Sequence, residues 1–480
     1  MTNINVKQFF QATNPGKTLF AENPQEDQKY YIDFSSVRGG QIIEDLRDNI
    51  ALWSPDEPTC QLFTGHIGCG KSTELLRLKA ELERGGFHVV YFESSQDLEM
   101  GDVDVSDILL AIAGRVSEAL EQLDKIKLAE PKGLKNILKG AAKLLQTDLE
   151  WSAEANLIGL GKVAASTNGK FEAEIGLPGI GQVNASDEEG LSFVALGIGK
   201  ITAKAKASPE LRSKLRGYLE PQTNGILEAI NQELLEPARE KLKRYGKNGL
   251  VVIVDNLDKV DSAPKPWGRP QQEYLFVDRG EQLRGLHCHV VYTMPLALRF
   301  SNDFGTLTQR FMVNPQVLPM VPVQQTDGSR FEQGIMLLRQ MVLARAFPNL
   351  SPETRLGKIR EVFDQPETFD RLCLVSGGHV RNLLRLLNDS IKKEKQLPIS
   401  SSSLETVIKN YRNERILAID EDEWVLLNKV AQQKKVVGDE GYQTLIRSMF
   451  VYEYRHSQEH WFDINPILAE AEGASLEFRI

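Results

Sequence analysis

The stretch Gln-Leu-Phe-Thr-Gly-His-Ile-Gly-Cys-Gly-Lys-Ser-Thr, residues 61–73, places a short strand directly before a glycine-rich turn. Leu75, Leu78 and Leu82 follow at helical spacing, so the turn leads into an amphipathic helix. Glycines in such a turn let backbone N–H groups surround phosphate oxygens, and the helix N-terminus favours the same anion. The stretch therefore predicts a phosphate-binding loop. The expected nucleotide contacts are Gly65, His66, Ile67, Gly68, Cys69, Gly70, Lys71, Ser72 and Thr73.

The last residues of this loop carry the expected chemistry. Lys71 is expected to reach the β- and γ-phosphates, and the Ser72 hydroxyl is expected to ligate Mg²⁺. ATP and Mg²⁺ are therefore the predicted cofactors. A glycine-rich turn without function is the alternative, and the strand before it and the helix after it disfavour that interpretation.

A second motif follows the continuous apolar run 250–254, which is typical of a strand buried on both faces of a parallel sheet. We expect Asp255, at the tip of this strand, to hold the water shell of Mg²⁺ opposite Ser72. Asp258, one turn further, is expected to orient the attacking water. The alternative for Asp258 is an ordinary acidic residue after a strand.

Length and charge limit the function classes. A chain of 480 residues has room for about two or three domains with substantial cores. Its hydrophobic content of 41% and charged content of 26% are those of a globular protein. The net charge of −9 argues against a nucleic-acid binder that uses its whole surface, although local basic patches remain open.

The cysteine spacing and the distribution of apolar residues indicate the cellular compartment in which the protein is expected. Four cysteines lie far apart without metal-ligand spacing, and we expect reduced thiols in a cytoplasmic protein. They are Cys60, Cys69, Cys288 and Cys373. No apolar run approaches the ~20 residues of a membrane span. The first residues lack a basic stretch followed by an apolar one, so no secretory signal is expected.

Strand and helix patterns alternate around the loop, which predicts an α/β fold with a doubly wound parallel sheet. Beyond the two strands above, strands are expected at 30–34, 88–92, 288–293 and 317–323, and a helix at 105–123. The segment 30–40 is expected to line the pocket for the base. The predicted divisions are an N-terminal segment 1–45, a P-loop domain 46–128 and 206–325, an insertion 129–205, a helical lid 326–410 and a winged-helix-like module 411–480.

The predicted insertion is rich in Gly and Ala and contains a recurring pattern. The segment 161–166 is echoed at 181–186 and at 199–204. Alternation at 171–175 and 201–205 favours β-hairpins, with a flexible glycine-rich loop as the alternative.

A basic amphipathic helix is expected just before the repeats. Its lysines are Lys132, Lys135, Lys139 and Lys143. Such a helix is seen at membrane surfaces and partner grooves, so membrane contact through residues 130–205 is one interpretation. The plain alternative is a solvated helix whose apolar face packs on its own domain.

The C-terminal part reads as helical from Phe331 onward, and the segment 376–381 opens a helix in the lid. Two apolar runs, 450–454 and 460–464, flank a polar turn and predict a hairpin. Helices followed by a hairpin predict a winged-helix-like module. Residues 411–480 carry 8 basic and 13 acidic groups, which favours packing on a protein surface over DNA binding.

These motifs occur in one order: phosphate loop, aspartate strand, lid arginine and terminal hairpin module. That order resembles the signal-transduction ATPases with numerous domains (STAND) and the origin-recognition-like branch of the AAA+ ATPases. The resemblance covers roughly residues 30–125 and 205–395 and, less closely, the final module. It implies an ATPase that uses Mg²⁺.

The resemblance also implies roles for three polar residues. Thr293 ends the strand after the aspartate strand and would touch the γ-phosphate or the water. Arg310 matches an arginine that reaches into the neighbouring subunit's site, and Arg381 matches a lid arginine that contacts phosphates of its own subunit. Each has an ordinary polar surface or capping residue as its alternative. Asn256 stands where AAA+ ATPases carry a glutamate, and an amide cannot act as a base, so slow hydrolysis is expected.

The leading hypothesis is a cytoplasmic ATPase switch whose nucleotide state controls conformation and self-association, with a homo-oligomer in the ATP state. A separate protein effector is a further expected partner. The rival is a DNA-associated AAA+ ATPase of the replication or transposition helper type, which would use the winged helix. ATP-dependent DNA binding that weakens steeply with salt would favour the rival. A small-molecule phosphotransferase is a third reading, but the sequence shows no acceptor site.

Overall fold

A computed structural model describes residues 4–123, 128–145, 163–165, 171–173, 189–438 and 440–471 of the chain. Its centre is a parallel sheet of five strands in the order β2-β5-β6-β1-β7. The strands are β1 (Cys60–Gly65), β2 (His88–Glu93), β5 (Leu250–Asp255), β6 (His289–Thr293) and β7 (Gln316–Leu318). Because β6 lies between β1 and β5, the end of β6 is flanked by the phosphate loop and the aspartate tip.

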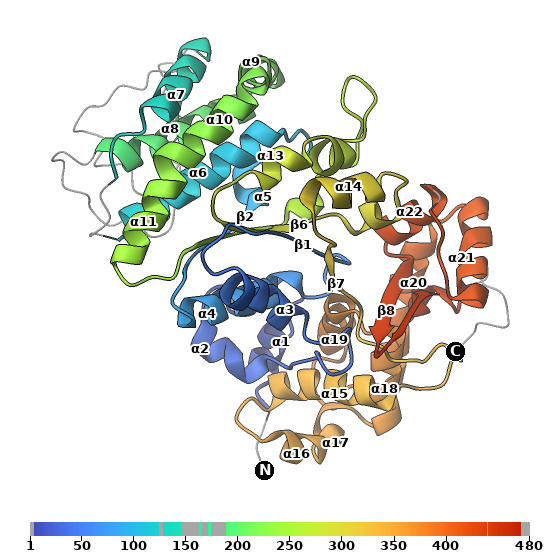
Figure 1. The fold of residues 1–480 in the computed structure, drawn as a ribbon. Coiled ribbons are helices and arrows are strands. Elements are labelled where there is room, and N and C mark those ends of the chain that lie inside the picture. Colours follow the sequence, from blue (N-terminus) through green and yellow to red (C-terminus); the bar gives the residue numbers. More distant parts are fainter. Residues whose placement is uncertain are drawn as a thin grey trace.

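Helices cover both faces of this sheet, as the doubly wound prediction requires (Figure 1). One face carries α3 (Ile42–Asp48) and α4 (Lys71–Arg84), whose leucines pack on alternate residues of the strands. The other face carries α6 (Val105–Glu121) and a group of later helices. These are α7 (Lys132–Leu144), α8 (Glu189–Lys206), α9 (Pro209–Leu219), α10 (Thr223–Ile230), α11 (Glu236–Arg244) and α13 (Gly280–Arg284).

The lid and the C-terminal module follow the sheet. The lid contains α15 (Glu332–Ala346), α16 (Pro352–Leu356), α17 (Ile359–Val362), α18 (Pro366–Val375), α19 (Val380–Glu394) and α20 (Ser401–Ile416). The C-terminal module contains α21 (Glu421–Gln433), α22 (Glu440–Arg447), β8 (Val451–His456) and β9 (Glu459–Ile464). The predicted hairpin is confirmed, because β8 and β9 pair antiparallel from Val451 opposite Ile464. Figure 1 shows the hairpin lying beside the sheet edge that ends in β7.

The shorter elements complete the chain. The helices are α1 (Val6–Ala12), α2 (Pro24–Asp27), α5 (Ser94–Asp97), α12 (Gln271–Glu273) and α14 (Phe304–Phe311). Two short strands, β3 (Val163–Ala165) and β4 (Phe171–Ala173), pair antiparallel, which confirms a hairpin in this part of the insertion. The repeat copy at 181–186 lies outside the described residues.

The predicted strand at 201–205 is wrong, because these residues belong to helix α8. Buried residues recur along α8 at intervals of three and four, at Leu191, Val194, Ile198, Ile201 and Ala205. The apolar–polar alternation at 201–205 is therefore part of a longer helical period. The buried face of this helix packs against α6, which stabilises the helix over a strand.

The predicted strand at 30–34 is also wrong. The 3₁₀ turn Gln28–Tyr30 ends there and no strand follows. The Asp33 carboxylate accepts a hydrogen bond from Ser35 N at 2.8 Å, and the Tyr31 hydroxyl donates to the carboxylate of Glu74. These contacts hold the segment against α4 as a loop, and they override the strand propensity of its aromatic residues.

The last strand of the sheet is shorter than the predicted 317–323. Strand β7 ends at Leu318, and Pro319, which lacks an N–H, follows it. Met320 N then donates to Glu453 O at 2.9 Å, so the chain leaves the sheet and pairs with β8. The C-terminal hairpin is thus joined to the edge of the P-loop domain.

The basic helix forms as predicted, as α7. Leu134, Leu138 and Ala141 are buried against neighbouring helices, while Lys132, Lys139 and Lys143 are exposed. The apolar face therefore packs on the molecule itself. Among the described residues, none of the helices combines the length and apolar character needed to cross a bilayer.

Candidate nucleotide-binding site

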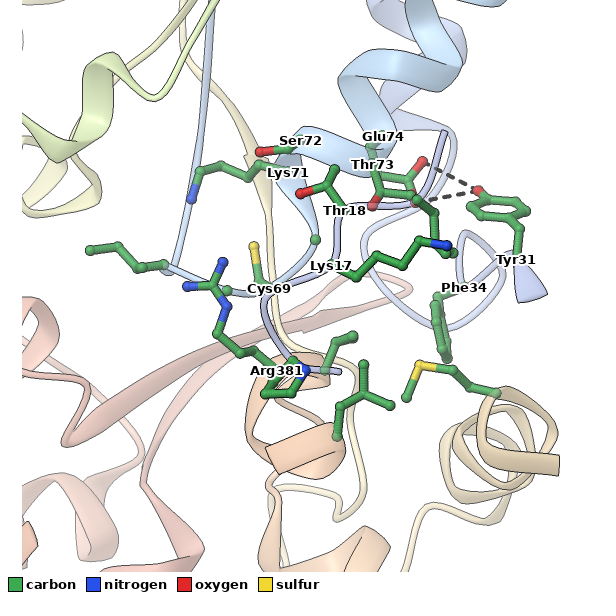
Figure 2. A pocket seen from close by; sticks show the side chains of 18 of the residues that line it. Lys17, Thr18, Tyr31, Phe34, Cys69, Lys71, Ser72, Thr73, Glu74 and Arg381 are labelled. Carbon is green, nitrogen blue, oxygen red and sulfur yellow. Dashed lines mark hydrogen bonds between the residues drawn. The ribbon is translucent and has the colours of Figure 1, made fainter. Parts of the chain in front are cut away.

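A cavity of about 110 Å³ lies over the phosphate loop. The loop and the first turn of α4 form its floor, the segment from Pro15 to Arg38 forms one wall, and helices α15 and α19 of the lid close it. Figure 2 shows the side chains of these separate parts of the chain converging on the loop. The expected base-pocket segment therefore lies at the cavity, although it forms no strand.

Two glycines give the loop its path. Gly68 has φ +86° and Gly70 has φ +108°, conformations that side chains disfavour. A Cβ on Gly68 would lie 2.8 Å from the His379 ring, so the lid approaches the loop too closely for any other residue. Helix α4 begins immediately after Gly70, which leaves its first N–H groups facing the cavity.

Lys71 is buried in the loop and points to its carbonyls. Its Nζ donates to Gly65 O at 2.8 Å and His66 O at 2.9 Å, and pairs with Asp258 Oδ2 at 3.0 Å. Burial would lower the pKa of Lys71, but Asp258, Cys69 and Asp255 together outweigh burial and raise that pKa. A charged amine is thus held at the place where phosphates are expected.

Asp255 and Ser72, the predicted metal pair, meet at one tyrosine. Asp255 Oδ2 accepts from the Tyr91 hydroxyl at 2.8 Å, and the Ser72 side chain lies beside Tyr91, where it partly offsets the rise in the pKa of Tyr91. Burial and the Asp255 carboxylate raise the pKa of Tyr91, so it stays protonated. Tyr91 comes from β2, two positions before the residue that pairs with Asp255, and no sequence motif indicated its role.

The donor set fits a magnesium ion bound with the nucleotide. Ser72 and Asp255 supply a hydroxyl and a carboxylate, which are oxygen ligands that Mg²⁺ prefers. Among the described residues, no group of three or more His, Cys, Asp or Glu side chains is placed to hold a metal ion by protein ligands alone. Phosphate oxygens would therefore complete the coordination.

Only one of the two carboxylate oxygens of Asp258 has an interaction partner among the residues that the structure describes. Oδ2 pairs with Lys71, while Oδ1 is buried and has no hydrogen-bond partner. A buried carboxylate oxygen without a partner is costly, and it would be satisfied by a water molecule in the site. This geometry fits the predicted role of Asp258 toward water.

The lid arginine lies in the same cavity. At the start of α19 the His379 Nε2 donates to Ile67 O at 2.8 Å, and Arg381 N donates to Gly68 O at 3.3 Å. The Arg381 side chain extends into the cavity on the side of Lys71 (Figure 2). It forms no ion pair with any residue in the described ranges, so its charge is available for an anion.

Thr293 and Arg310 do not line the cavity. Thr293 is fully buried; its Oγ1 accepts from Leu257 N at 2.9 Å and donates to Val254 O at 3.3 Å. Thr293 thus fixes the turn that carries Asp255 and Asp258. Arg310, at the end of α14, donates to Asp278 O. The roles that the resemblance implies for these two residues remain predictions.

The cavity wall formed by the segment from Pro15 to Arg38 contains contacts that the sequence did not indicate. The Tyr31 hydroxyl lies 3.3 Å from both oxygens of Glu74, and burial raises the pKa of Glu74. Arg38 Nη1 donates to Cys69 O at 3.2 Å and so ties the N-terminal segment to the phosphate loop. Phe34 and Tyr31 line the same cavity (Figure 2).

The C-terminal hairpin also contacts the phosphate loop. Glu453 N, in β8, donates to His66 Nε2 at 2.9 Å. The Tyr452 ring lies edge-on to His66 and stacks on His379 of the lid. Its hydroxyl accepts from Asn382 Nδ2 at 3.0 Å. Loop, lid and hairpin therefore meet at two histidines, and sequence reasoning had given neither histidine this role.

Acid is expected to loosen this junction. Burial lowers the pKa of His66 and of His379 to about 3. Each ring nitrogen that would take the proton accepts a backbone N–H, from Glu453 to His66 and from Asn382 to His379. Unfolded histidines titrate near 6.5, so the unfolded chain binds more protons between pH 3 and 6.5 and stability falls as pH falls.

The expected loss at pH 5.5 is ~1.4 kcal/mol for each histidine relative to neutral pH. Melting temperatures at pH 7.5 and 5.5 measure it. The double variant His66→Gln, His379→Asn keeps acceptors for both N–H groups but does not titrate, so its melting temperature should fall less. An equal fall in wild type and variant would show that these histidines do not carry the effect.

The chain resembles known proteins only at the level of distant solved structures. No family model and no curated protein matches the chain. Among solved structures, the Aeropyrum pernix ORC2 protein (ADPNP–ADP complexes) is similar with a TM-score of 0.39 and 11% identity over 95% of this chain and 94% of that chain. CDC6P from Pyrobaculum aerophilum gives 0.33 and 11% over 96% and 97%. At these TM-scores the likeness carries no argument about function.

All four cysteines are free and buried. Cys69 lies in the loop, and its Sγ is 3.6 Å from Leu318 O. No disulfide forms among them, as their spacing indicated.

Proposed function

We propose that the chain is a Mg²⁺-dependent ATP-binding protein that hydrolyses ATP slowly and works as a conformational switch. The observation that carries the proposal is one cavity that brings together Lys71, Ser72, Asp255 and Asp258 from the P-loop domain and Arg381 from the lid. A lysine, an arginine without an ion-pair partner among the described residues, and a helix N-terminus converge on the same space, which suits a polyphosphate.

The existing contacts of Lys71 supply the first step of the switch. The amine is held by Asp258 and two loop carbonyls. Phosphate oxygens would compete for the amine, and each charge-assisted hydrogen bond to phosphate is stronger than one to a neutral carbonyl. ATP binding would therefore free the Asp258 carboxylate as it engages Lys71.

The loop transmits this change because its own carbonyls hold the lid. Ile67 O and Gly68 O accept hydrogen bonds from α19, and His66 accepts one from β8. A shift of the loop around phosphates would alter these bonds together. A ligand shifts the equilibrium between two lid positions only if it binds one of them more tightly. Arg381 would supply this difference in affinity, because it can contact phosphate only when the lid lies on the loop.

For hydrolysis, Mg²⁺ held by Ser72 and Asp255 would neutralise charge on the phosphates when the nucleotide is bound. Asp258 would accept a hydrogen bond from the water that attacks the γ-phosphorus. Asn256 has φ +63° and its backbone N–H donates to Asp255, so it orients the metal residue and supplies no base. Turnover that is slow suits a switch that must remain in its ATP state.

Arg381→Ala tests the lid half of the proposal. Loss of one charge-assisted contact should weaken ATP binding by about 10- to 100-fold, since such a bond contributes ~1.5–3 kcal/mol. Arg385→Ala is the matched control, because Arg385 lies one turn along α19 and its Nη1 contacts Tyr411 outside the cavity. Calorimetric titration with ATP and with ADP measures both. Equal affinity of both variants for ATP would remove Arg381 from the site.

Self-association in the ATP state, a protein effector and DNA association remain predictions. Sedimentation with ADP and with a non-hydrolysable ATP analogue tests the first. Titration with duplex DNA at two salt concentrations tests the last, since binding through phosphates weakens with salt.

A further inference from the structure

A second cavity, of about 40 Å³, adjoins the site at its far end. Ile67 and Asp258 line both cavities, so the second continues from the first past the Lys71–Asp258 pair. Its remaining walls come from the beginning of the phosphate loop, from the residues after β6, and from helix α22 of the C-terminal module. Space for a few water molecules exists there.

This end of the site is where the γ-phosphate and the attacking water belong. Lys71 reaches the β- and γ-phosphates in a loop of this kind, and the cavity begins beside its partner Asp258. The free Oδ1 of Asp258 is buried without a partner at this point. The small cavity therefore adjoins the reacting atoms, whereas the N-terminal wall adjoins the base.

One cation from the C-terminal module lines this cavity. Arg447, the last residue of α22, donates from Nη1 to Ser262 Oγ at 2.8 Å, and Ser262 lies four residues after Asp258. Arg447 forms no ion pair in the part of the chain that the structure describes, and it is exposed. Four of the five N–H groups of its guanidinium are thus not committed to the one hydrogen bond described.

The position of α22 is fixed independently of Arg447. The helix packs on the 3₁₀ turn Leu296–Phe300 that follows β6, and Gln443 Nε2 donates to Phe300 O at 3.2 Å. Ile446 and Met449 complete the wall of the cavity on this side. The module therefore covers the γ-phosphate end of the site within one chain.

We propose that Arg447 is the arginine that contacts the γ-phosphate during hydrolysis, supplied by the same chain. The inference rests on the proposed ATPase function and adds a catalytic residue to it. An arginine at the transferring phosphoryl group stabilises the charge of the transition state whether it comes from the same chain or from a partner. Arg310, by contrast, lies outside both cavities and would need a second subunit.

The reaction that Arg447 assists is a hydrolysis. The oxygen of water forms a bond to the γ-phosphorus while the bond between that phosphorus and the β–γ bridging oxygen breaks. The bonding electrons stay on the ADP oxygen, and one proton of the water passes to the Asp258 carboxylate and then to solvent. Arg447 donates hydrogen bonds to the γ-phosphate oxygens throughout, and the products are ADP and inorganic phosphate.

The test compares Arg447→Ala, Arg447→Lys and Arg244→Ala in the full chain. Arg244 is an exposed arginine at the end of α11 and serves as the matched control. Arg447→Ala should lower turnover by about 100-fold or more, with Arg447→Lys between it and wild type. ADP affinity should stay within about twofold of wild type in all three, because Arg447 reaches only the γ-phosphate end.

Two further readouts complete the test. Turnover per wild-type chain should be independent of protein concentration, since the arginine comes from the same chain. Affinity for ADP with aluminium fluoride, a mimic of the transferring phosphoryl group, should fall in Arg447→Ala even if turnover is too slow to measure. Turnover and aluminium-fluoride affinity within about twofold of wild type in Arg447→Ala would overturn the proposal. If the wild-type chain bound no ADP, that result would instead overturn the proposed function.

Discussion

Replacing Lys71 with alanine is expected to lower ATP affinity by about 100-fold, since a charge-assisted hydrogen bond to phosphate contributes ~1.5–3 kcal/mol. Hydrolysis should fall below detection. The amine is the charged group at the centre of the phosphate loop, and three loop and acidic oxygens already hold it there. Calorimetric titration with ATP and release of inorganic phosphate measure the two effects.

The same change has a structural consequence that must be separated from binding. Lys71 is 6% exposed and pairs with Asp258, so its removal leaves a buried carboxylate unpaired at a cost of ~1–3 kcal/mol. The double variant Lys71→Ala, Asp258→Ala removes both charges and should regain stability but not ATP binding. Lys79→Ala, at a half-buried position of α4 outside the cavity, is the control for the single change. ATP binding by Lys71→Ala at wild-type affinity would contradict the assignment of the loop.

Asp255→Asn is expected to separate metal dependence from nucleotide binding. The amide keeps an oxygen for the Asn256 N–H but loses the negative charge that attracts Mg²⁺. A carboxylate that acts through the water shell of a metal contributes about 10–100-fold to metal affinity, so the Mg²⁺ concentration for half-maximal turnover should rise by that factor. Affinity for ADP without metal should be unchanged. Titration of turnover with MgCl₂ provides the measurement.

Tyr91→Phe is the companion variant for this prediction. Tyr91 donates a hydrogen bond to Asp255, yet it holds no charge, so its replacement should shift the metal dependence less than Asp255→Asn does. The same Mg²⁺ dependence in wild type and Asp255→Asn would show that Asp255 does not face the metal.

Patterns within a short window could be predicted from the sequence. The phosphate loop, the buried strand that ends in Asp255 and the C-terminal hairpin each have a local signature, and the structure contains all three elements. Helix α6 begins with a capping box at Asp104 and has a long apolar period, and it also lies where predicted. For such elements, the turn residues, the apolar period and the strand length can all be read from a few consecutive residues.

Contacts between distant segments could not be predicted. Tyr91 reaches Asp255 across 164 positions and His66 reaches Glu453 across 387, so nothing in either local window indicates the partner. The two strand predictions failed for the related reason that packing decided the outcome. Helix α6 stabilises 201–205 as a helix, and Glu74 holds Tyr31 in a loop.

We expect nucleotide binding to alter the contacts of the phosphate loop with the lid and the hairpin. Hydrogen exchange of the full chain, measured without nucleotide, with ADP and with a non-hydrolysable ATP analogue, tests it most directly. Two amides report the junction: Arg381 N, bonded to Gly68 O, and Glu453 N, bonded to His66. We predict that the exchange rates of both amides differ between the ADP and ATP-analogue states, and that Lys71→Ala abolishes the difference. Identical exchange at both amides in all three states, with nucleotide bound, would contradict the claim.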